Sequence, residues 1–386
     1  MFKFSQLGGG EREYLLREAQ IPVYHKISVL SDVSTTWTPD VIHIHSHGID
    51  PQIAAHISAI YPTAQVCEQN VFAVPSGYNK LDVSFQLSTW CCWNYLSFSK
   101  SLSNKERLQI LPNPVNPDNF HPITKAERKT FRDHYGIPSD AFVLLRVGQP
   151  IVAKWNVHMI DIFVDFKRTH PQAYLICVGA PQEIKDRSHK FNELRNCTLF
   201  IDKIVDDNDL RICYGSADLF FHMARIGESF GIVLAEAQLC GLPIVTVHTP
   251  YCDNSQAEVV GHNQGGLVAN RRKGILKALD KLASNPALRE QMGQNGRTSV
   301  LKRFSIDHVV HEFEKYVSPD AGHEKSIYTF RKEEVSHYLK DAIDPPIPFA
   351  DFLFFQKRRF IRILPEKVFR YAFRLYCHLF DSSVQL

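Results

Sequence analysis

The 386-residue chain has no apolar run close to the ~20 residues that a membrane-spanning helix needs. Its first ten residues also lack the longer apolar stretch of a secretory signal peptide. Charge of neither sign is in large excess, since 44 Lys and Arg stand against 41 Asp and Glu, a net charge of +3. Binding to nucleic acid through overall charge is therefore not expected. We expect a cytoplasmic protein.

The nine cysteines form no C-x-x-C pair, are odd in number and are irregularly spaced. This pattern predicts neither a disulfide framework nor a zinc site. Most of the cysteines adjoin apolar residues and are expected to be small buried hydrophobes. A redox-active pair at Cys91 and Cys92 is the less favoured alternative.

Hydrophobic residues make up 44% and charged residues 22% of the chain, which is typical of globular proteins, and the length suggests two or three domains. In the first third, short β-branched or apolar runs alternate with helical spacing. The pattern predicts a helix at 51–60 and strands at 41–45, 64–67, 82–87 and 109–112. Such alternation indicates βαβ units and a doubly wound sheet.

Residues 112–122 are crowded with Pro, Asn and Asp and are typical of a connector between domains. The alternation then starts again. It predicts helices at 124–135, 157–169, 206–215, 231–240, 275–302 and 305–317, and strands at 142–147, 173–178, 197–200, 217–222 and 243–247. We therefore expect two Rossmann-like domains, 1–122 and 123–318, followed by an extension at 319–386.

The stretch from Gly227 to Ala237 holds two glutamates, Glu228 and Glu236, with seven residues between them. Gly231 would let the backbone approach a ligand closely, and the helix that begins near Ser229 would offer N–H groups to a phosphate. Glu236 could accept hydrogen bonds from vicinal hydroxyls. The spacing alone favours the plainer alternative, an acidic cap and one buried or solvated glutamate.

The rest of the pattern changes that interpretation. The stretch closely resembles the E-x-F-G-x-x-x-x-E signature of retaining, GT-B-fold glycosyltransferases of family 4, the nucleotide-sugar-dependent "group 1" class. The resemblance is strong over 109–315, weaker over 8–100 and absent after about 320. Four further segments resemble motifs of that family: 113–120 its interdomain segment, 146–154 its G-R-x-x-x-x-K loop, 216–220 its "sADlf" strand and 240–245 its "cGlPvv" strand.

The resemblance implies an α/β GT-B fold, in which two Rossmann-like domains face a central cleft. It implies transfer of a sugar from a nucleoside diphosphate sugar to a glycan, a lipid-linked acceptor or a small molecule, with retention of anomeric configuration. The nucleotide sugar would be a co-substrate, with no bound cofactor and no metal.

The family's functional residues carry over to several positions. Glu228 would contact the donor sugar, Glu236 the ribose, and Lys154 would neutralise the diphosphate. Gln149 stands where the family has its arginine, so Arg146 is expected to substitute if its side chain points into the cleft, with a structural ion pair as the equal alternative. The predicted catalytic set is Glu228, Lys154 and Arg146, and the predicted donor-binding set is Gly148, Gln149, Ser229, Phe230, Gly231 and Glu236.

Three histidines, His43, His45 and His47, alternate along the strand at 41–45 and its exit, so they should face one side. A metal site is one interpretation, but the family often has a similar strand without metal, and His45 or His47 would either line the cleft or pack. Asn70 stands where many relatives carry a cleft histidine, and an amide can hydrogen-bond but cannot transfer a proton at neutral pH. The acidic run 206–209 is interpreted as a helix cap rather than a metal cluster.

Both ends of the chain depart from the family. Gly9 and Gly10 resemble its glycine loop, but too little chain follows, so either the first elements are absent and the sheet is shortened, or the sheet is rearranged and the glycines form a turn. Residues 351–380 mix aromatic and basic side chains. They are either a peripheral anchor on an anionic membrane or a helical element packed on the first domain.

Two other activities stay open. One is a GT-B phosphorylase or synthase. The other is a degenerate, non-catalytic protein that binds nucleotide sugars, which the missing arginine and the shortened start would suit. A dinucleotide-dependent oxidoreductase is a distant third, because no G-x-G-x-x-G follows a strand.

Overall fold

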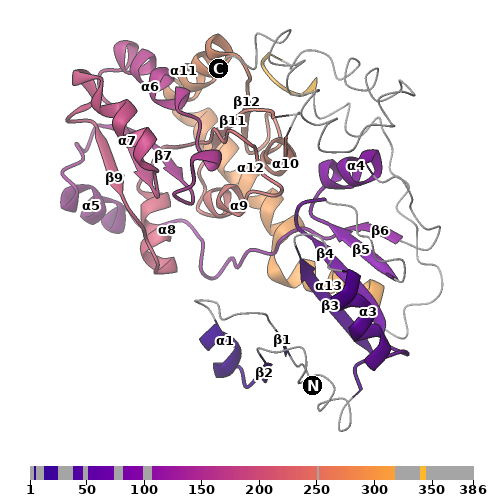
Figure 1. The fold of residues 1–386 in the computed structure, drawn as a ribbon. Helices are drawn as coiled ribbons and strands as arrows, with labels where there is room; N and C mark the ends of the chain where they lie inside the picture. The colour runs from indigo at the N-terminus through magenta and orange to yellow at the C-terminus, as the bar shows by residue number, and fades with distance from the viewer. Residues whose placement is uncertain are drawn as a thin grey trace, which may run out of the picture.

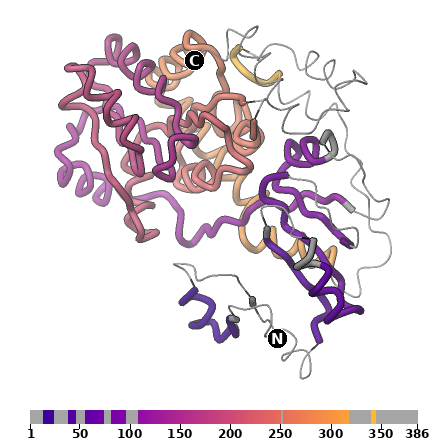
Figure 2. Tube along the Cα trace, in the orientation of Figure 1, coloured from indigo at the N-terminus to yellow at the C-terminus, as the bar shows by residue number. Residues whose placement is uncertain are grey.

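The computed structural model describes residues 4–5, 13–24, 38–46, 51–73, 81–98, 107–249, 252–317 and 340–344. Their strands form two main parallel sheets, one of four strands and one of six, each with helices around it (Figures 1 and 2). A separate parallel pair joins β1 (Phe4–Ser5) to β2 (Val23–Tyr24), with α1 (Glu13–Glu18) between them in the chain. Gly9, Gly10, His47 and the 351–380 stretch lie outside the described residues.

The four-stranded sheet keeps its strands in chain order: β3 (Val41–Ser46), β4 (Gln65–Asn70), β5 (Val83–Gln86) and β6 (Arg107–Ile110). Helix α3 (Pro51–Ile60) follows β3, and α4 (Thr89–Phe98) follows β5. The predicted strands and the helix at 51–60 are confirmed. Helix α4 was not predicted, because its run of Trp, Cys and Tyr is apolar on nearly every side and shows no helical stripe. Within the described residues this sheet begins at β3.

The six-stranded sheet is doubly wound, in the order β12-β11-β10-β7-β8-β9. From β7 the chain adds β8 and then β9 on one side of the sheet. It then returns to pair β10 with the other side of β7 and adds β11 and β12 beyond it. The strand order therefore reverses between β7 and β10. Doubly wound sheets bind ligands beyond the carboxyl ends of the strands at such a switch point. The strands are β7 (Phe142–Val147), β8 (Ala173–Val178), β9 (Thr198–Ile201), β10 (Leu219–Phe221), β11 (Ile244–Thr246) and β12 (Gly266–Val268).

Helices on both faces cover this sheet, so β7, β8, β10, β11 and β12 are buried along their whole length, as expected of parallel strands. This sheet and its helices hold the main hydrophobic core. The helices are α5 (Lys125–His134), α6 (His158–Thr169), α7 (Gln182–His189), α8 (Asp207–Gly215), α9 (Ile232–Leu239), α10 (Ser255–Val260), α11 (Arg272–Ala283), α12 (Pro286–Phe304) and α13 (Ile306–Val317), with short 3-10 turns at Val152–Lys154 and Asn192–Leu194.

The single helix predicted over 275–302 is in fact two, α11 and α12. The break falls at Asn285 and Pro286: the Asn285 side chain accepts a hydrogen bond from the Leu288 N–H at 3.0 Å, and Pro286 takes the first helical position. The leucine stripe continues through this break, so the sequence pattern did not show where one helix ends and the next begins. Helices α7 and α10 and strand β12 were also not predicted.

Helix α13 leaves the second sheet and packs on the first. Its Phe313 ring lies 4.7 Å from the His43 ring and 5.6 Å from the Phe85 ring, and its Val309 joins the apolar cluster under β4 and β5. The sequence pattern predicts these residues as part of the second domain. The apolar stripe of the helix was visible in the sequence, but not which sheet would cover it. The chain therefore crosses between the two sheets a second time.

Helices α4 and α10 also join the two halves. The Glu258 carboxylate accepts hydrogen bonds from the Thr89 N–H at 3.1 Å and the Thr89 hydroxyl at 2.9 Å, which caps the start of α4. The hydroxyls of Ser88 and Ser255 are 2.6 Å apart. Among the described residues, no helix is long and apolar enough to cross a membrane.

Candidate active site

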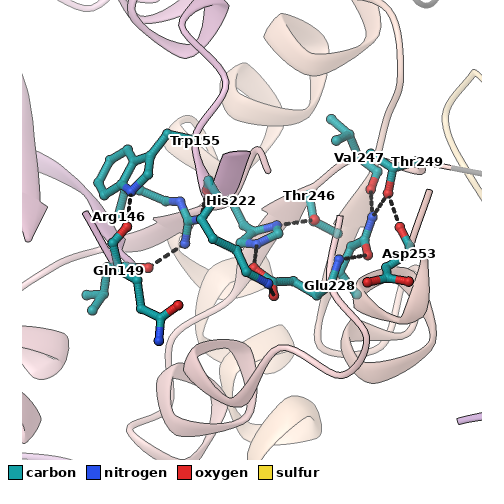
Figure 3. Close-up of polar contacts among 12 residues, drawn as sticks. Arg146, Gln149, Trp155, His222, Glu228, Thr246, Val247, Thr249 and Asp253 are labelled. Carbon is teal, nitrogen blue, oxygen red and sulfur yellow. Dashed lines mark hydrogen bonds and ion pairs between the residues drawn. The ribbon is translucent and has the colours of Figure 1, made fainter. Parts of the chain in front are cut away.

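The candidate site lies at the switch point of the six-stranded sheet. Three segments meet there: the loop after β7, the loop from the end of β10 to α9, and the segment between β11 and α10 (Figure 3). The loop after β7 carries Lys154, and the loop before α9 carries Glu228. The topology therefore brings together two motifs that are 74 residues apart in the chain.

Glu228 is the centre of a hydrogen-bonded group. Its Oε2 atom lies 2.5 Å from Nζ of Lys154, and its Oε1 atom lies 3.3 Å from Nε2 of His222. Nδ1 of His222 lies 2.9 Å from the hydroxyl of Thr246 (Figure 3). Glu228 is only 7% exposed, whereas the Lys154 side chain is 24% exposed. A ligand would therefore reach the group from the lysine side.

The surroundings fix the charges of this group. Burial raises the pKa of Glu228, but the hydrogen bond and charge of His222 and the charges of Lys154 and Arg146 outweigh it and lower that pKa to about 2. Burial, with the charge of Arg146, lowers the pKa of His222 to about 4. Near neutral pH Glu228 is therefore a carboxylate that only accepts hydrogen bonds, and His222 is neutral. This network assigns the His222 proton to Nε2, which donates to Glu228, while Nδ1 accepts from Thr246.

Two glycines make the loop before α9 possible. Gly227 has a φ of +67° and Gly231 a φ of +90°, both in the left-handed region. A Cβ atom on Gly231 would lie 2.7 Å from Cδ1 of Leu234 and 3.2 Å from Cγ of Glu228. Gly231 is the N-cap of α9, and no side chain caps it. The positive end of α9 therefore adjoins Glu228, and this arrangement favours a bound anion.

The surroundings of Arg146 favour a structural role over the predicted catalytic one. Its side chain is 0% exposed, and its guanidinium donates to the backbone oxygens of Val147 and Lys154, 2.7 Å away in the second case. It also lies 5.0 Å from the centre of the Trp155 ring, and burial lowers its pKa (Figure 3). Arg146 therefore holds the loop after β7 from inside. The sequence of a strand that is buried on both faces is a nearly continuous apolar run. It therefore does not indicate which side chain will pack beneath the loop that follows.

The remaining donor-side residues of that loop lie at its turn. The N–H of Gly148 bonds to the Val178 oxygen at 3.0 Å, and the oxygen of Gln149 accepts from the Trp155 indole at 2.9 Å. The Gln149 side chain is exposed, so it does not hold the loop from inside as Arg146 does. These bonds shape the loop that returns Lys154 to Glu228.

Glu236 lies further along α9, where it is half-buried and accepts a hydrogen bond from the Tyr214 hydroxyl at 2.9 Å. Burial and the Glu236 charge raise the pKa of Tyr214 well above its ordinary value, so the phenol stays a donor. Phe230 is buried, edge-on to Phe304 at 5.0 Å, and the oxygen of Ser229 accepts from the Cys91 thiol at 3.3 Å. The ligand contacts of these residues stay predictions.

The predicted cleft residues of the first sheet lie on β3 and β4. His43 and His45 do face one side, with ring centres 4.3 Å apart, but His43 stacks on Phe313, and burial lowers its pKa to about 3. Asn70 is buried and donates to Glu68 at 3.3 Å. His43 is thus a packing residue, and the cleft roles of His45 and Asn70 stay predictions.

Two alternatives from the sequence are decided by local contacts. Asp206 is the N-cap of α8 and accepts from the Asp209 N–H at 2.9 Å, so the acidic run is a helix cap. Cys91 and Cys92 are buried free thiols, and burial raises the pKa of Cys91 to about 12, which disfavours redox chemistry there. Among the described residues, no cluster of three His, Cys, Asp or Glu side chains is placed to hold a metal ion.

Three residues that contact Glu228 or its partners were not predicted as site residues from the sequence: His222, Thr246 and Gln256. Gln256 is fully buried: its Oε1 accepts from the Glu228 N–H at 3.1 Å, and its Nε2 donates to the Val247 oxygen at 2.9 Å. His222 ends the predicted strand at 217–222, so its strand-end position was an available signal. Gln256 offered none, because α10 itself was not predicted.

Residues 127–299 match the protein family described as "Glycosyl transferases group 1". This part of the chain is similar to group 1 glycosyltransferases. It contains Lys154, Glu228, Glu236 and all of β7 to β12. The match covers the second sheet and leaves the first sheet outside.

The curated proteins that match this chain are distant relatives. The putative glycosyltransferase YtcC of Bacillus subtilis is 28% identical over 193 residues, 47% of this chain and 46% of its own. The alpha-monoglucosyldiacylglycerol synthase of Acholeplasma laidlawii is 23% identical over 202 residues, 51% of this chain and 49% of its own. The chain thus spans about half the length of these curated relatives.

Solved structures show the fold over a larger part of the chain. Anabaena Alr3699/HepE, in complex with UDP and glucose, has a TM-score of 0.66 at 16% identity and covers 82% of this chain and 91% of its own. A glycosyltransferase from Rickettsia africae has a TM-score of 0.69 at 17% identity, covering 82% of this chain and 90% of its own. The two-sheet architecture is the GT-B fold.

Proposed function

We propose that this protein transfers a sugar from a nucleoside diphosphate sugar to an acceptor hydroxyl, with retention of anomeric configuration. The observation that supports it most directly is the contact between Lys154 and Glu228 at the uncapped start of α9. A cation, a helix N-terminus and an acceptor-only carboxylate converge on one place. A diphosphate needs the first two, and the hydroxyls of a sugar need the third.

In this proposal Lys154 and the N–H groups at the start of α9 hold the diphosphate. The carbon–oxygen bond to that diphosphate breaks, the acceptor oxygen bonds to the same carbon, and the acceptor proton leaves with the diphosphate. Stabilising the charge that develops on the departing group is the largest electrostatic need of such a step. Glu228 orients the sugar through its hydroxyls and Glu236 binds the ribose, while no metal is required.

The comparisons guide the choice of substrates. HepE was solved with UDP and glucose, and the Acholeplasma relative is named as a glucosyldiacylglycerol synthase. We therefore place UDP-sugars first among donors, and glycans, lipid-linked sugars and small molecules as the acceptor classes. A lipid-linked acceptor would require the protein to work at a membrane surface, with residues 351–380 as the proposed peripheral contact.

Donor binding is tested by thermal shift against UDP-, GDP-, ADP- and CMP-sugars. A ligand that binds only the folded protein raises its melting temperature, so one of these donors should stabilise the wild type. Lys154→Ala should lose that shift, and Lys125→Ala, an exposed lysine at the start of α5, should keep it. The proposal fails if none of these nucleotide sugars changes the melting temperature.

The burial of Arg146 favours a second candidate, a non-catalytic protein that binds nucleotide sugars. With Gln149 at the family's arginine position and Arg146 under the loop, Lys154 is the one cation of the 146–154 motif that reaches Glu228. A donor that binds tightly and is neither transferred nor hydrolysed would support this candidate over the first.

A further inference from the structure

A short segment from the C-terminal part of the chain is docked on the domain of the six-stranded sheet. Residues 340–344, here called the strap, lie beside β12, and the N–H of Ile343 donates to the Val268 oxygen at 2.9 Å (Figure 1). Ile343 also packs against the main hydrophobic core. The strap lies beyond α13, outside the 127–299 family match.

Asp344 fixes the strap to the start of α11. Its carboxylate accepts hydrogen bonds from the N–H groups of Asn270 at 2.6 Å and of Arg271 at 2.7 Å, and its backbone oxygen accepts from the Asn270 side chain at 2.6 Å. No side chain of the helix's own N-cap residue caps α11, and a carboxylate suits the positive end of a helix. Gly274 allows the approach, because a Cβ atom there would collide with the Asp344 carboxylate.

A chain of buried hydrogen bonds runs from the strap toward the site. Asn270, which holds Asp344, also accepts from the N–H of His248 at 2.8 Å. Nδ1 of His248 lies 3.4 Å from Nδ2 of Asn254, and the Asn254 Oδ1 accepts from the N–H of Thr249 at 2.7 Å. Asn270, His248 and Asn254 are buried.

The same chain ends on the backbone of Glu228. Gln256 donates to Asn254 at 3.3 Å and to the Thr249 hydroxyl at 2.6 Å, and it accepts from the Glu228 N–H. The N–H of Ser255 donates to the Glu228 oxygen at 2.9 Å. Both backbone groups of Glu228 are thus held by the start of α10, which Asn254 and His248 tie to the strap.

We propose that the strap positions Glu228: Asp344 holds residues 247–249 and 252–256 through Asn270 and His248, and Gln256 transmits that placement to the loop before α9. The strap and Gln256 are positioning elements that touch no substrate. The catalytic consequence rests on the proposed function, whereas the mechanical coupling does not. A strap that only capped α11 would leave residues 227–231 and 247–256 unaffected when it was removed.

The test is hydrogen–deuterium exchange of the full chain without any donor. Asp344→Ala removes both carboxylate hydrogen bonds, and Gly274→Ala displaces the carboxylate while leaving the strap sequence intact. We expect exchange at 227–231 and 247–256 to rise roughly tenfold in both variants, as the loss of one or two hydrogen bonds implies. Exchange in β7 should stay unchanged. Lys340→Ala, at an exposed strap residue, is the matched control and should resemble the wild type.

Gly274→Ala separates coupling from general instability. Alanine favours a helix over glycine by about 1 kcal/mol, which offsets the loss of the Asp344 carboxylate at the start of α11, so the helix should stay about as stable as in the wild type while the site loop loosens. The proposal is overturned if exchange at 227–231 and 247–256 is unchanged in Gly274→Ala and Asp344→Ala alike. Asp344→Asn, which keeps one acceptor oxygen, replaces Asp344→Ala should the latter not fold.

Turnover supplies the second measurement. With a donor in hand, Gly274→Ala should lower kcat/KM for the donor about tenfold, because Glu228 is held less often in its bound geometry. A wild type with no activity toward any donor would reject the proposed function and leave the exchange test standing. An active wild type with unchanged exchange in both strap variants would reject the strap alone.

Discussion

At the scale of the residue, the two basic side chains of the 146–154 motif differ in burial and in their partners. Lys154 reaches Glu228 from a partly exposed position, whereas Arg146 is buried and bonded to backbone oxygens. Their variants should therefore fail in different ways. Removing Arg146 leaves buried carbonyls without donors, and removing Lys154 leaves a site that solvent can enter.

We expect Arg146→Met to lower the free energy of unfolding by roughly 2 kcal/mol or more, because the backbone oxygens of Val147 and Lys154 lose their donor. Lys154→Met should cost clearly less stability while it removes donor binding. Urea unfolding of both variants, with donor binding measured on the folded fraction, decides the matter. An Arg146→Met protein as stable as the wild type but unable to bind donor would contradict the account and restore the cleft role.

The buried histidines predict how stability depends on pH. Burial lowers the pKa of His222 and of His248 to about 4, below the ordinary 6.5, so the folded state binds fewer protons than the unfolded state between those values. Their stabilising contribution is complete above pH 6.5 and is lost as the pH falls toward 4, with a slope of up to about 1.4 kcal/mol per pH unit for each ring. Urea unfolding between pH 7.5 and 4.5 should show this fall, and His222→Gln should reduce the slope. Equal slopes in both proteins would show that His222 is not buried neutral.

At the scale of the element, the start of α9 depends on Gly231. Its φ of +90° disfavours any side chain, and a Cβ atom would press on Leu234 and Glu228. Gly231→Ala should cost about 1–2 kcal/mol from the backbone alone and should move Glu228 as well.

Gly136→Ala is the matched control, since Gly136 has a φ of +64° with nothing within 4 Å of a new Cβ. We expect both variants to lose stability in urea but only Gly231→Ala to lose donor binding. Equal donor binding in the two would contradict the role of the α9 start.

The elements also show where sequence reasoning ends. Strands β7 and β8 were predicted at their observed bounds, because short buried runs between turn residues have few alternatives. Helix α4 was missed because an apolar run that is buried all round has no period. The break between α11 and α12 depends on one Asn-Pro pair within a continuous leucine stripe. At the site, motif spacing identified Lys154 and Glu228, but the partners His222 and Gln256 follow from packing between distant segments.

At the scale of the whole molecule, the connector near 112–122, helix α13 and the Glu258 cap on α4 are among the described contacts that join the two sheets. The strap is also a long-range contact, but it returns to the second sheet. The site lies where the strand order of that sheet reverses, and the family match covers the same residues. Topology, motif and charge therefore point to one location.

The central claim is that Glu228 and Lys154 serve sugar transfer from a nucleotide donor. The most direct test is turnover of the donor found by thermal shift, in the wild type and in Glu228→Gln, with the product anomer identified by NMR. We predict transfer with the donor's anomeric configuration kept, and a loss of at least about 100-fold in Glu228→Gln, the usual scale for a lost electrostatic contact to the reacting group. Unchanged turnover in Glu228→Gln, or a wild type that binds the donor and never transfers it, would contradict the claim.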